Sequence, residues 1–205
     1  MGVYTETLLV IKSQDTDFIE RLFLAISPGP KLTAIQNIVT KSFRIRPKPT
    51  AIQNIVYKLF RIEHDHSIGL MQYLLPMPEE LEKTVTNGYS GESPEWRNWR
   101  KAHWGAPYDV GLEYCERKSD GEIEMRFTSY NGFLSTGLTN ASKAHRFSFK
   151  LLYHCDHGGV GHHTESDQVD FDFPGEMAPA EAGISKELID AFDLEEQYKA
   201  YVEEL

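Results

Sequence analysis

The chain has 205 residues, of which 40% are hydrophobic and 25% are charged, and a formal net charge of -10. This length and composition predict a globular protein of one large domain or two small ones and exclude disordered and fibrous proteins. No apolar run approaches the ~18 residues of a membrane span and the first residues lack a signal peptide, so we expect a cytoplasmic protein with no membrane partner. Cys115 and Cys155 lie in no CxxC pair, which fits a reducing compartment.

The N-terminal part of the chain predicts a strand followed by a helix. Residues 7–12 form a short apolar run, and Asp15 or Thr16 can cap a helix whose apolar residues between 18 and 26 share one face. Residues 70–75 are also apolar and end at a proline, so we expect a further strand there.

A tandem repeat lies between these segments. Residues 33–45 and 50–62 are identical at 11 of 13 positions, and residues 31–62 carry seven basic residues and no acid. Two copies fall short of the roughly three units that a solenoid needs, so the repeat is a local duplication. Its apolar spacing is helical while its β-branched content favours strand, which leaves two short helices or one helix and one strand open.

The second half of the chain predicts a helix and then an antiparallel sheet. Residues 95–104 are rich in Trp and Arg and predict a helix that ends at Gly105. Beyond it, apolar and polar residues alternate, which is typical of antiparallel strands with one wet face. The alternating segments are residues 110–127, 147–155 and 169–173. The chain closes with an acidic helix expected over residues 185–204, so the fold class is α+β.

Two motifs carry a resemblance to a known family. Residues 76–81 are PMPEEL, and the Trp-rich helix runs into HWGAPYDV at residues 103–110. In this combination the chain resembles the Api92-like family of phage- and plasmid-borne proteins. The residues that match the second motif are Asn98, Trp104, Gly105 and Asp109.

The resemblance implies a fold and an origin. It implies a ferredoxin-like domain over residues 1–175, with an antiparallel sheet, helices on one face and the repeat of residues 31–62 as an insertion. Residues 176–205 then form an acidic C-terminal linker and helix. The resemblance also implies a mobile-element protein in the cytoplasm of a bacterial host, and the family has no established activity to carry over.

The chain lacks the usual markers of catalysis. It contains no GxGxxG, GxxxxGK[ST], HExxH or GxSxG, so we expect no enzyme and no cofactor. One cluster has the residue types of a zinc site, because zinc prefers four nitrogen or sulfur ligands. Its candidate ligands are His154, His157, His162 and His163. The alternative is an exposed hairpin loop, and on that interpretation we expect no metal.

Charge is distributed unevenly along the chain, and two segments are candidate contact sites. Residues 156–205 contain 14 acids and two lysines, in contrast to the basic repeat. The candidate contact residues are Arg44, Arg46, Lys48, Lys58 and Arg61 in the repeat, and Asp190, Asp193, Glu195 and Glu196 in the acidic helix. The Trp-Arg helix can stack bases or a partner through cation-π contacts, or can simply pack in the core.

Two functions from different classes follow. The first is a non-enzymatic accessory protein of a phage or mobile element that binds and inhibits a host protein, such as an anti-defence or anti-CRISPR factor. The alternative is a single-stranded nucleic-acid-binding module that uses the basic repeat. The partner is then a host protein or complex, or nucleic acid, and the oligomeric state is open, with a homodimer as one outcome.

Overall fold

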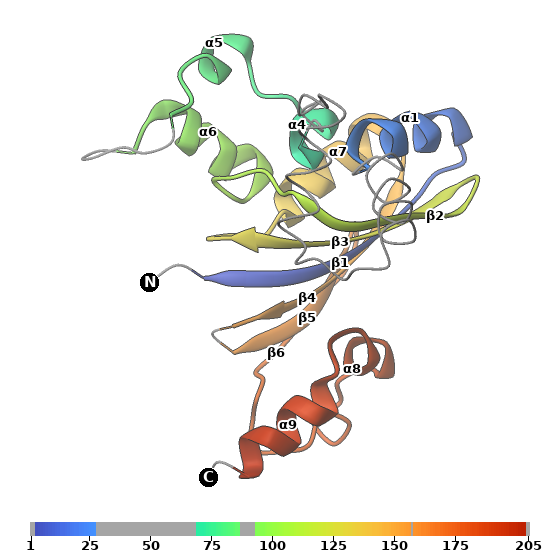
Figure 1. The fold of residues 1–205 in the computed structure, drawn as a ribbon, viewed down its shortest axis with the longest axis vertical. Coiled ribbons are helices and arrows are strands. Elements are labelled where there is room, and N and C mark those ends of the chain that lie inside the picture. The colour runs from blue at the N-terminus through green and yellow to red at the C-terminus, as the bar shows by residue number, and fades with distance from the viewer. Residues whose placement is uncertain (1–2, 28–68, 87–92, 157, 204–205) are drawn as a thin grey trace, which may run out of the picture.

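The computed structural model describes residues 3–27, 69–86, 93–156 and 158–203. Six strands form its sheet: β1 (Tyr4–Lys12), β2 (Leu112–Ser119), β3 (Glu122–Tyr130), β4 (Ser148–Cys155), β5 (Gly159–Thr164) and β6 (Gln168–Phe171). Their order is β2-β3-β1-β4-β5-β6, and every neighbouring pair is antiparallel (Figure 1). The predicted α+β class with an antiparallel sheet is therefore confirmed. The tandem repeat of residues 31–62 lies outside the described residues.

Seven helices accompany the sheet in the described part of the chain. They are α1 (Thr16–Ile26), α4 (Leu70–Leu74), α5 (Glu79–Glu82), α6 (Glu95–Trp104), α7 (Ser135–His145), α8 (Lys186–Phe192) and α9 (Leu194–Glu203). Among them, none is long and apolar enough to cross a bilayer. The predicted cap of α1 is confirmed, because the carboxylate of Asp15 accepts a hydrogen bond from the Phe18 backbone N–H at 2.9 Å.

Helices cover both faces of the sheet, which corrects the expectation of helices on one face. Figure 1 shows α1, α4, α5, α6 and α7 on one side and α8 and α9 on the other. Neighbouring strand residues point to opposite faces, so Leu151 belongs to the core with the first group and Leu152 packs with Leu188 of α8. The physical reason is the apolar second face of β4 and β5, where Leu152 and Val160 are buried.

The predicted strand over residues 70–75 is wrong, because this segment forms α4. The carboxylate of Asp109 accepts hydrogen bonds from the backbone N–H groups of Met71 and Gln72 at 2.9 and 2.7 Å. These are first-turn N–H groups that a helix cannot satisfy internally. The preceding Gly69 lets the carboxylate approach, since a Cβ there would lie 2.3 Å from Asp109 Oδ2. Asp109 therefore starts a helix that lies far before it in the sequence.

The HWGAPYDV segment anchors α6 to the same region. The indole of Trp104 is fully buried and donates a hydrogen bond to the Leu75 carbonyl at 2.8 Å. Gly105 ends α6 with a φ of 90°, a left-handed conformation that glycine adopts without strain. The residues that carry the family resemblance thus hold α4 and α6 together.

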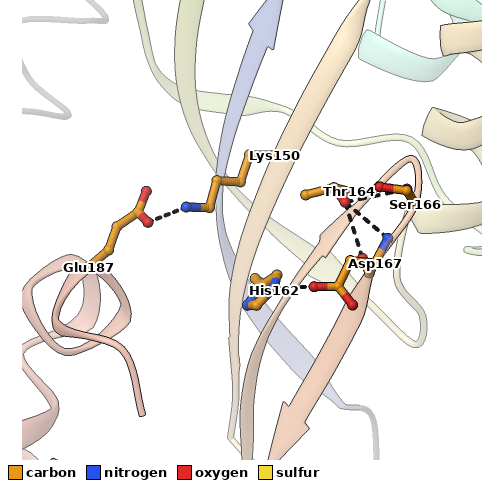
Figure 2. A network of polar contacts seen from close by, with 6 residues as sticks. All are labelled: Lys150, His162, Thr164, Ser166, Asp167 and Glu187. Atoms are coloured by element: carbon orange, nitrogen blue, oxygen red, sulfur yellow. Dashed lines mark hydrogen bonds and ion pairs between the residues drawn. The ribbon is translucent and has the colours of Figure 1, made fainter.

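The C-terminal helix predicted over residues 185–204 is two helices. Ser185 caps the first as expected, accepting from the Leu188 N–H, but Asp193 adopts a left-handed φ of 52° and separates α8 from α9. Lys150 of β4 pairs with Glu187 of α8 (Figure 2), and Arg126 of β3 donates to the Ala191 carbonyl at 3.2 Å. Polar contacts therefore reinforce the apolar docking of α8.

We expect Asp109→Ala to lower the free energy of unfolding by about 1–3 kcal/mol, because it removes the acceptor of buried backbone N–H groups. Urea denaturation followed by circular dichroism measures the change. Asp120→Ala, which removes an acid whose side chain is 89% exposed, is the control. Equal midpoints for Asp109→Ala and the wild type would contradict the role of Asp109.

Leu188→Ala tests whether α8 belongs to the cooperative unit. Leu188 is fully buried, so we expect a loss of about 2–5 kcal/mol in a single shifted transition. The control is Leu24→Ala on α1, where the side chain is 70% exposed. If the main transition is unchanged while the C-terminal residues melt separately, residues 176–205 are an independent unit instead.

Candidate functional site

A cavity of about 390 Å³ lies at the end of the sheet where β1 begins and β4 ends. We call it the end pocket and define it by six of its lining residues: Phe133, Tyr153, Cys155, Gly159, Asp170 and Asp172. They come from the loop after β3, from β4 and β5, and from β6 and the residue following it. The volume falls within the usual range for small-ligand sites, about 300–1,000 Å³.

Two aromatic rings form one wall of the end pocket. The rings of Phe133 and Tyr153 meet edge to face with centroids 4.7 Å apart. Tyr153 is almost wholly buried, whereas Phe133 is 38% exposed. The loop that carries Phe133 is fixed at its start, because Asn131 adopts a left-handed φ of 58° and its side chain accepts from the Val3 N–H at 3.1 Å. The aromatic wall is therefore held before any ligand arrives.

Two glycines of β5 lie at the end pocket and beside it: Gly159 lines the cavity, and Gly161 is two residues further along the same face. The register pairs Gly161 with Tyr153 on one side and with Asp170 on the other, so these three positions share a face. A Cβ at Gly161 would lie 2.5 Å from the Tyr153 hydroxyl oxygen. That hydroxyl lies over the strand and has no hydrogen-bond partner among the described residues. By contrast, a Cβ at Gly159 would meet nothing nearer than the Phe171 carbonyl oxygen at 4.0 Å.

Two exposed aspartates form the opposite rim. Asp170 and Asp172 are two residues apart in extended chain, so both side chains leave it on the pocket side. The Gln168 side chain donates a hydrogen bond to Asp170 Oδ2 at 3.0 Å. None of the described residues that line the end pocket is basic. The rim therefore carries negative charge that no lining side chain neutralises.

The thiol in the end pocket is not activated. Burial raises the pKa of Cys155, and its sulfur lies 3.2 Å from the Thr5 hydroxyl. Nucleophilic cysteines need a lowered pKa or a neighbouring base. The adjacent His154 lies on the other face, where its ring centroid is 5.8 Å from that of Phe173 and 5.9 Å from that of Phe192. Burial lowers the pKa of His154, so it is a neutral packing residue.

The histidine-rich segment of residues 154–163 covers the end of β4 and most of β5, so His154, His162 and His163 lie on paired strands and not in an exposed hairpin loop. His162 Nε2 lies 3.2 Å from Asp167 Oδ2 (Figure 2). Asp167 belongs to the turn between β5 and β6, where the Thr164 hydroxyl accepts a hydrogen bond from the Asp167 N–H. His163 lies on the opposite face, 3.3 Å from the Thr139 hydroxyl. His157 lies outside the described residues. Within the described ranges no group of three or more His, Cys, Asp and Glu could hold a metal ion.

The four acidic candidates lie at the junction of α8 and α9, and none of them lines the end pocket. Asp190 pairs with Lys186 at 2.8 Å, and Glu196 pairs with Lys199 at 2.7 Å. The basic candidates of the repeat, Arg44 to Arg61, fall outside the described residues. The structure brings the four acids together in one short segment.

The Trp-Arg helix packs in the core, which is the second of the two alternatives that the sequence left open. Trp96 and Trp104 of α6 are buried, so neither ring is free to stack on a base. The Arg100 guanidinium lies over both, 5.2 and 4.7 Å from their centroids, and burial lowers its pKa. The cation-π contacts here are internal.

The sequence reasoning missed an exposed aromatic pair as well as the end pocket. Tyr4 and Tyr130 lie opposite each other on β1 and β3 with ring centroids 5.0 Å apart, and Tyr108 is 6.0 Å from Tyr130. Tyr4 is 55% exposed. Tyr4 and Tyr130 lie just outside the residues for which the sequence predicted strands, 7–12 and 110–127. Extending the alternation of apolar and polar residues beyond these ranges would have included both tyrosines.

No family model and no curated protein matches the chain. The backbone is similar to the crystal structure of a protein api92 from Yersinia pseudotuberculosis, with 11% sequence identity and a TM-score of 0.43. The match covers 85% of this chain and 99% of that one. That structure bears the name of the family that the motifs resemble. At this identity and TM-score the similarity establishes neither a family nor an activity for this chain, and the resemblance stays a prediction.

We expect purified protein to carry no stoichiometric zinc, because His162 and His163 leave the strand on opposite faces and His154 packs against aromatic rings. Elemental analysis after dialysis measures the metal content. About one zinc per chain, lost when His157 and His162 are replaced by alanine, would contradict this and make β5 and its turn a structural site.

Proposed function

We propose that this chain is a non-enzymatic protein that binds another protein, with the end pocket as a contact site. The observation that carries the proposal is the combination of a preformed aromatic wall with an uncompensated acidic rim. Binding sites typically join apolar walls to a few placed polar groups in this way. The acidic junction of α8 and α9 adds a second surface of the same sign, which favours a basic partner and speeds its association.

The chemistry of the end pocket favours binding over catalysis. Its thiol has a raised pKa, and among the described residues no histidine lies beside it on the same face. The remaining titratable groups are a tyrosine and two solvent-exposed aspartates. Both aspartates are exposed to solvent, whereas active sites typically close around the reacting groups and exclude water.

The same proposal includes a ferredoxin-like fold and a role as a protein of a phage or mobile element. The element order β1-α1-β2-β3-α7-β4, with α4, α5 and α6 inserted between α1 and β2, and the sheet order β2-β3-β1-β4 support a ferredoxin-like domain that β5 and β6 extend. A phage or mobile-element origin, and inhibition of a host defence system such as CRISPR, rest on the resemblance of the two motifs alone. A cytoplasmic location in the bacterial host follows from that origin.

A single-stranded nucleic-acid-binding module is the second candidate. The exposed pair of Tyr4 and Tyr130 favours it, because neighbouring aromatic rings on a sheet face can stack bases. The same face carries Glu6, Glu116 and Glu124 beside Arg126 and Lys118, and Lys118 pairs with Glu116 and Glu124. Its charge is therefore mixed and offers no continuous basic track for phosphates. With a net charge of -10, the chain as a whole also disfavours nucleic acid.

Capture of a partner tests the proposal. Full-length chain immobilised on beads should retain a specific protein from the natural host. A variant with Asp190, Asp193, Glu195 and Glu196 changed to Lys should retain about tenfold less, because charge complementarity is lost. The control reverses Glu79, Glu80 and Glu82 of α5, an acidic helix away from both surfaces.

Binding of a single-stranded nucleic acid is the outcome that would contradict the proposal. Salt-sensitive binding of a labelled single-stranded oligonucleotide, removed by Arg44→Glu, Arg46→Glu and Arg61→Glu together and unaffected by the four lysine changes, would overturn the protein-binding proposal. Each lost phosphate contact then reduces the salt slope by close to one unit. Loss of that binding in Tyr4→Ala would locate it on the open sheet face.

A further inference from the structure

We infer that the end pocket receives the guanidinium group of an arginine side chain from the protein partner, an inference that rests on the proposed function. Four independent features of the pocket select a flat organic cation on a side chain over an anion, a metal ion or a neutral apolar group. They are the acidic rim, the aromatic wall, the unpartnered hydroxyl of Tyr153 and the edge strand β6.

The acidic rim supplies the charge. Asp170 and Asp172 face the pocket, and among the described residues Asp170 engages Gln168 through one of its two oxygens. Asp172 has no ion pair or hydrogen bond among the described residues. Two carboxylates that are exposed before binding can each accept N–H donors without first losing a salt bridge. Arginine presents five such donors in a fixed plane, which suits two separated carboxylates better than the point charge of lysine.

The aromatic wall supplies a surface for the plane of the cation. Phe133 and Tyr153 are locked edge to face, and the exposed part of Phe133 belongs to a ring whose loop is fixed at Asn131. A guanidinium stacks on such a ring with cation-π attraction while its edge still donates hydrogen bonds. A metal ion would gain nothing from this wall, and the described residues hold no cluster of three or more His, Cys, Asp and Glu that could ligate one.

The Tyr153 hydroxyl supplies an acceptor inside the pocket. Tyr153 is 5% exposed, lines the cavity and has no hydrogen-bond partner among the described residues. Its hydroxyl oxygen is not one of the fully buried side-chain atoms without a partner, so it remains accessible and can accept a hydrogen bond from an occupant. It lies over Gly161, where any side chain would displace it.

The edge of the sheet favours a side chain of a protein over a free amine. Strand β6 is an edge strand of the described sheet, and the acidic rim consists of its residue Asp170 and of Asp172 just after it. An extended segment of a partner can pair with such an edge while one side chain in two points to the pocket face. The main chain then adds binding energy that a free cation cannot obtain.

Two-dimensional amide NMR of the full chain tests the inference with the peptide N-acetyl-Ala-Arg-Ala-amide as the probe. We expect saturable shifts at Gly158, Gly159 and Asp170 that weaken with added salt. The same peptide with citrulline, which keeps the shape of arginine and removes its charge, should bind about tenfold more weakly or less.

Pocket variants make the result specific. Asp170→Asn with Asp172→Asn should weaken peptide binding about tenfold. Gly159→Leu should abolish it by filling space that is open in the structure. Asp120→Asn is the matched control at a distant turn, and retained amide dispersion shows that each variant is folded. Equal binding of the arginine and citrulline peptides, or unchanged binding in Gly159→Leu, would overturn the inference.

Three further outcomes separate this inference from the proposed function. If the chain captures a host protein and the pocket variants capture it equally well, the proposed function stands and the inference fails. If arginine amide alone binds as tightly as the peptide, the pocket is a site for a small cation and the assignment to a partner side chain fails. If the peptide binds as expected but no protein is captured, the proposed function fails while the pocket keeps its arginine chemistry.

Discussion

Burial of β4 on both faces is the constraint on which the rest of the fold depends. Leu151 points into the core covered by α1, α4, α6 and α7, and the next residue, Leu152, points into the core covered by α8. The strand is held between β1 and β5 in continuous antiparallel register. Because adjacent residues of β4 point into different cores, a shift of the strand by one residue would move each side chain into the opposite core. The pairing of β4 therefore ties the two layers of helices to one sheet.

The elements that the sequence predicted correctly are those whose determinants are local. Alternation over a few residues indicated β2, β3 and β4, and Asp15 and Ser185 capped the helices that follow them. The errors have distant causes. Residues 70–75 become a helix because Asp109 satisfies their N–H groups from another part of the chain. The break at Asp193 carries neither Gly nor Pro, so no local signal marked it.

The functional site was harder to predict than the fold, for a related reason. The end pocket is lined by residues from separate segments, and only the sheet order brings Phe133, Tyr153 and Asp170 together. The histidines predicted a metal site because they are close in sequence, yet His162 and His163 are adjacent residues of a strand and point to opposite faces of the sheet. Proximity along a strand is therefore a poor guide to a shared site, whereas residues two apart, such as Asp170 and Asp172, share a side.

The position of the end pocket follows from the pattern of β5 and β6. On the face toward α8 these strands carry Val160, His162, Val169 and Phe171. On the other face they carry Gly159, Gly161, His163, Gln168 and Asp170. One apolar face is enough to fix two strands to the sheet from the side of α8. Their other face carries no aliphatic or Phe, Tyr or Trp side chain for a helix to bury, although His163 contacts Thr139 of α7 there. The buried apolar residues of the first core therefore end at β4 while the sheet continues. A pocket forms at that step, walled by the last aromatic residue of the first core and by the acids of the edge strand. The glycines and acids on this face of β5 and β6 thus leave the two strands uncovered by helices and accessible to a positively charged occupant.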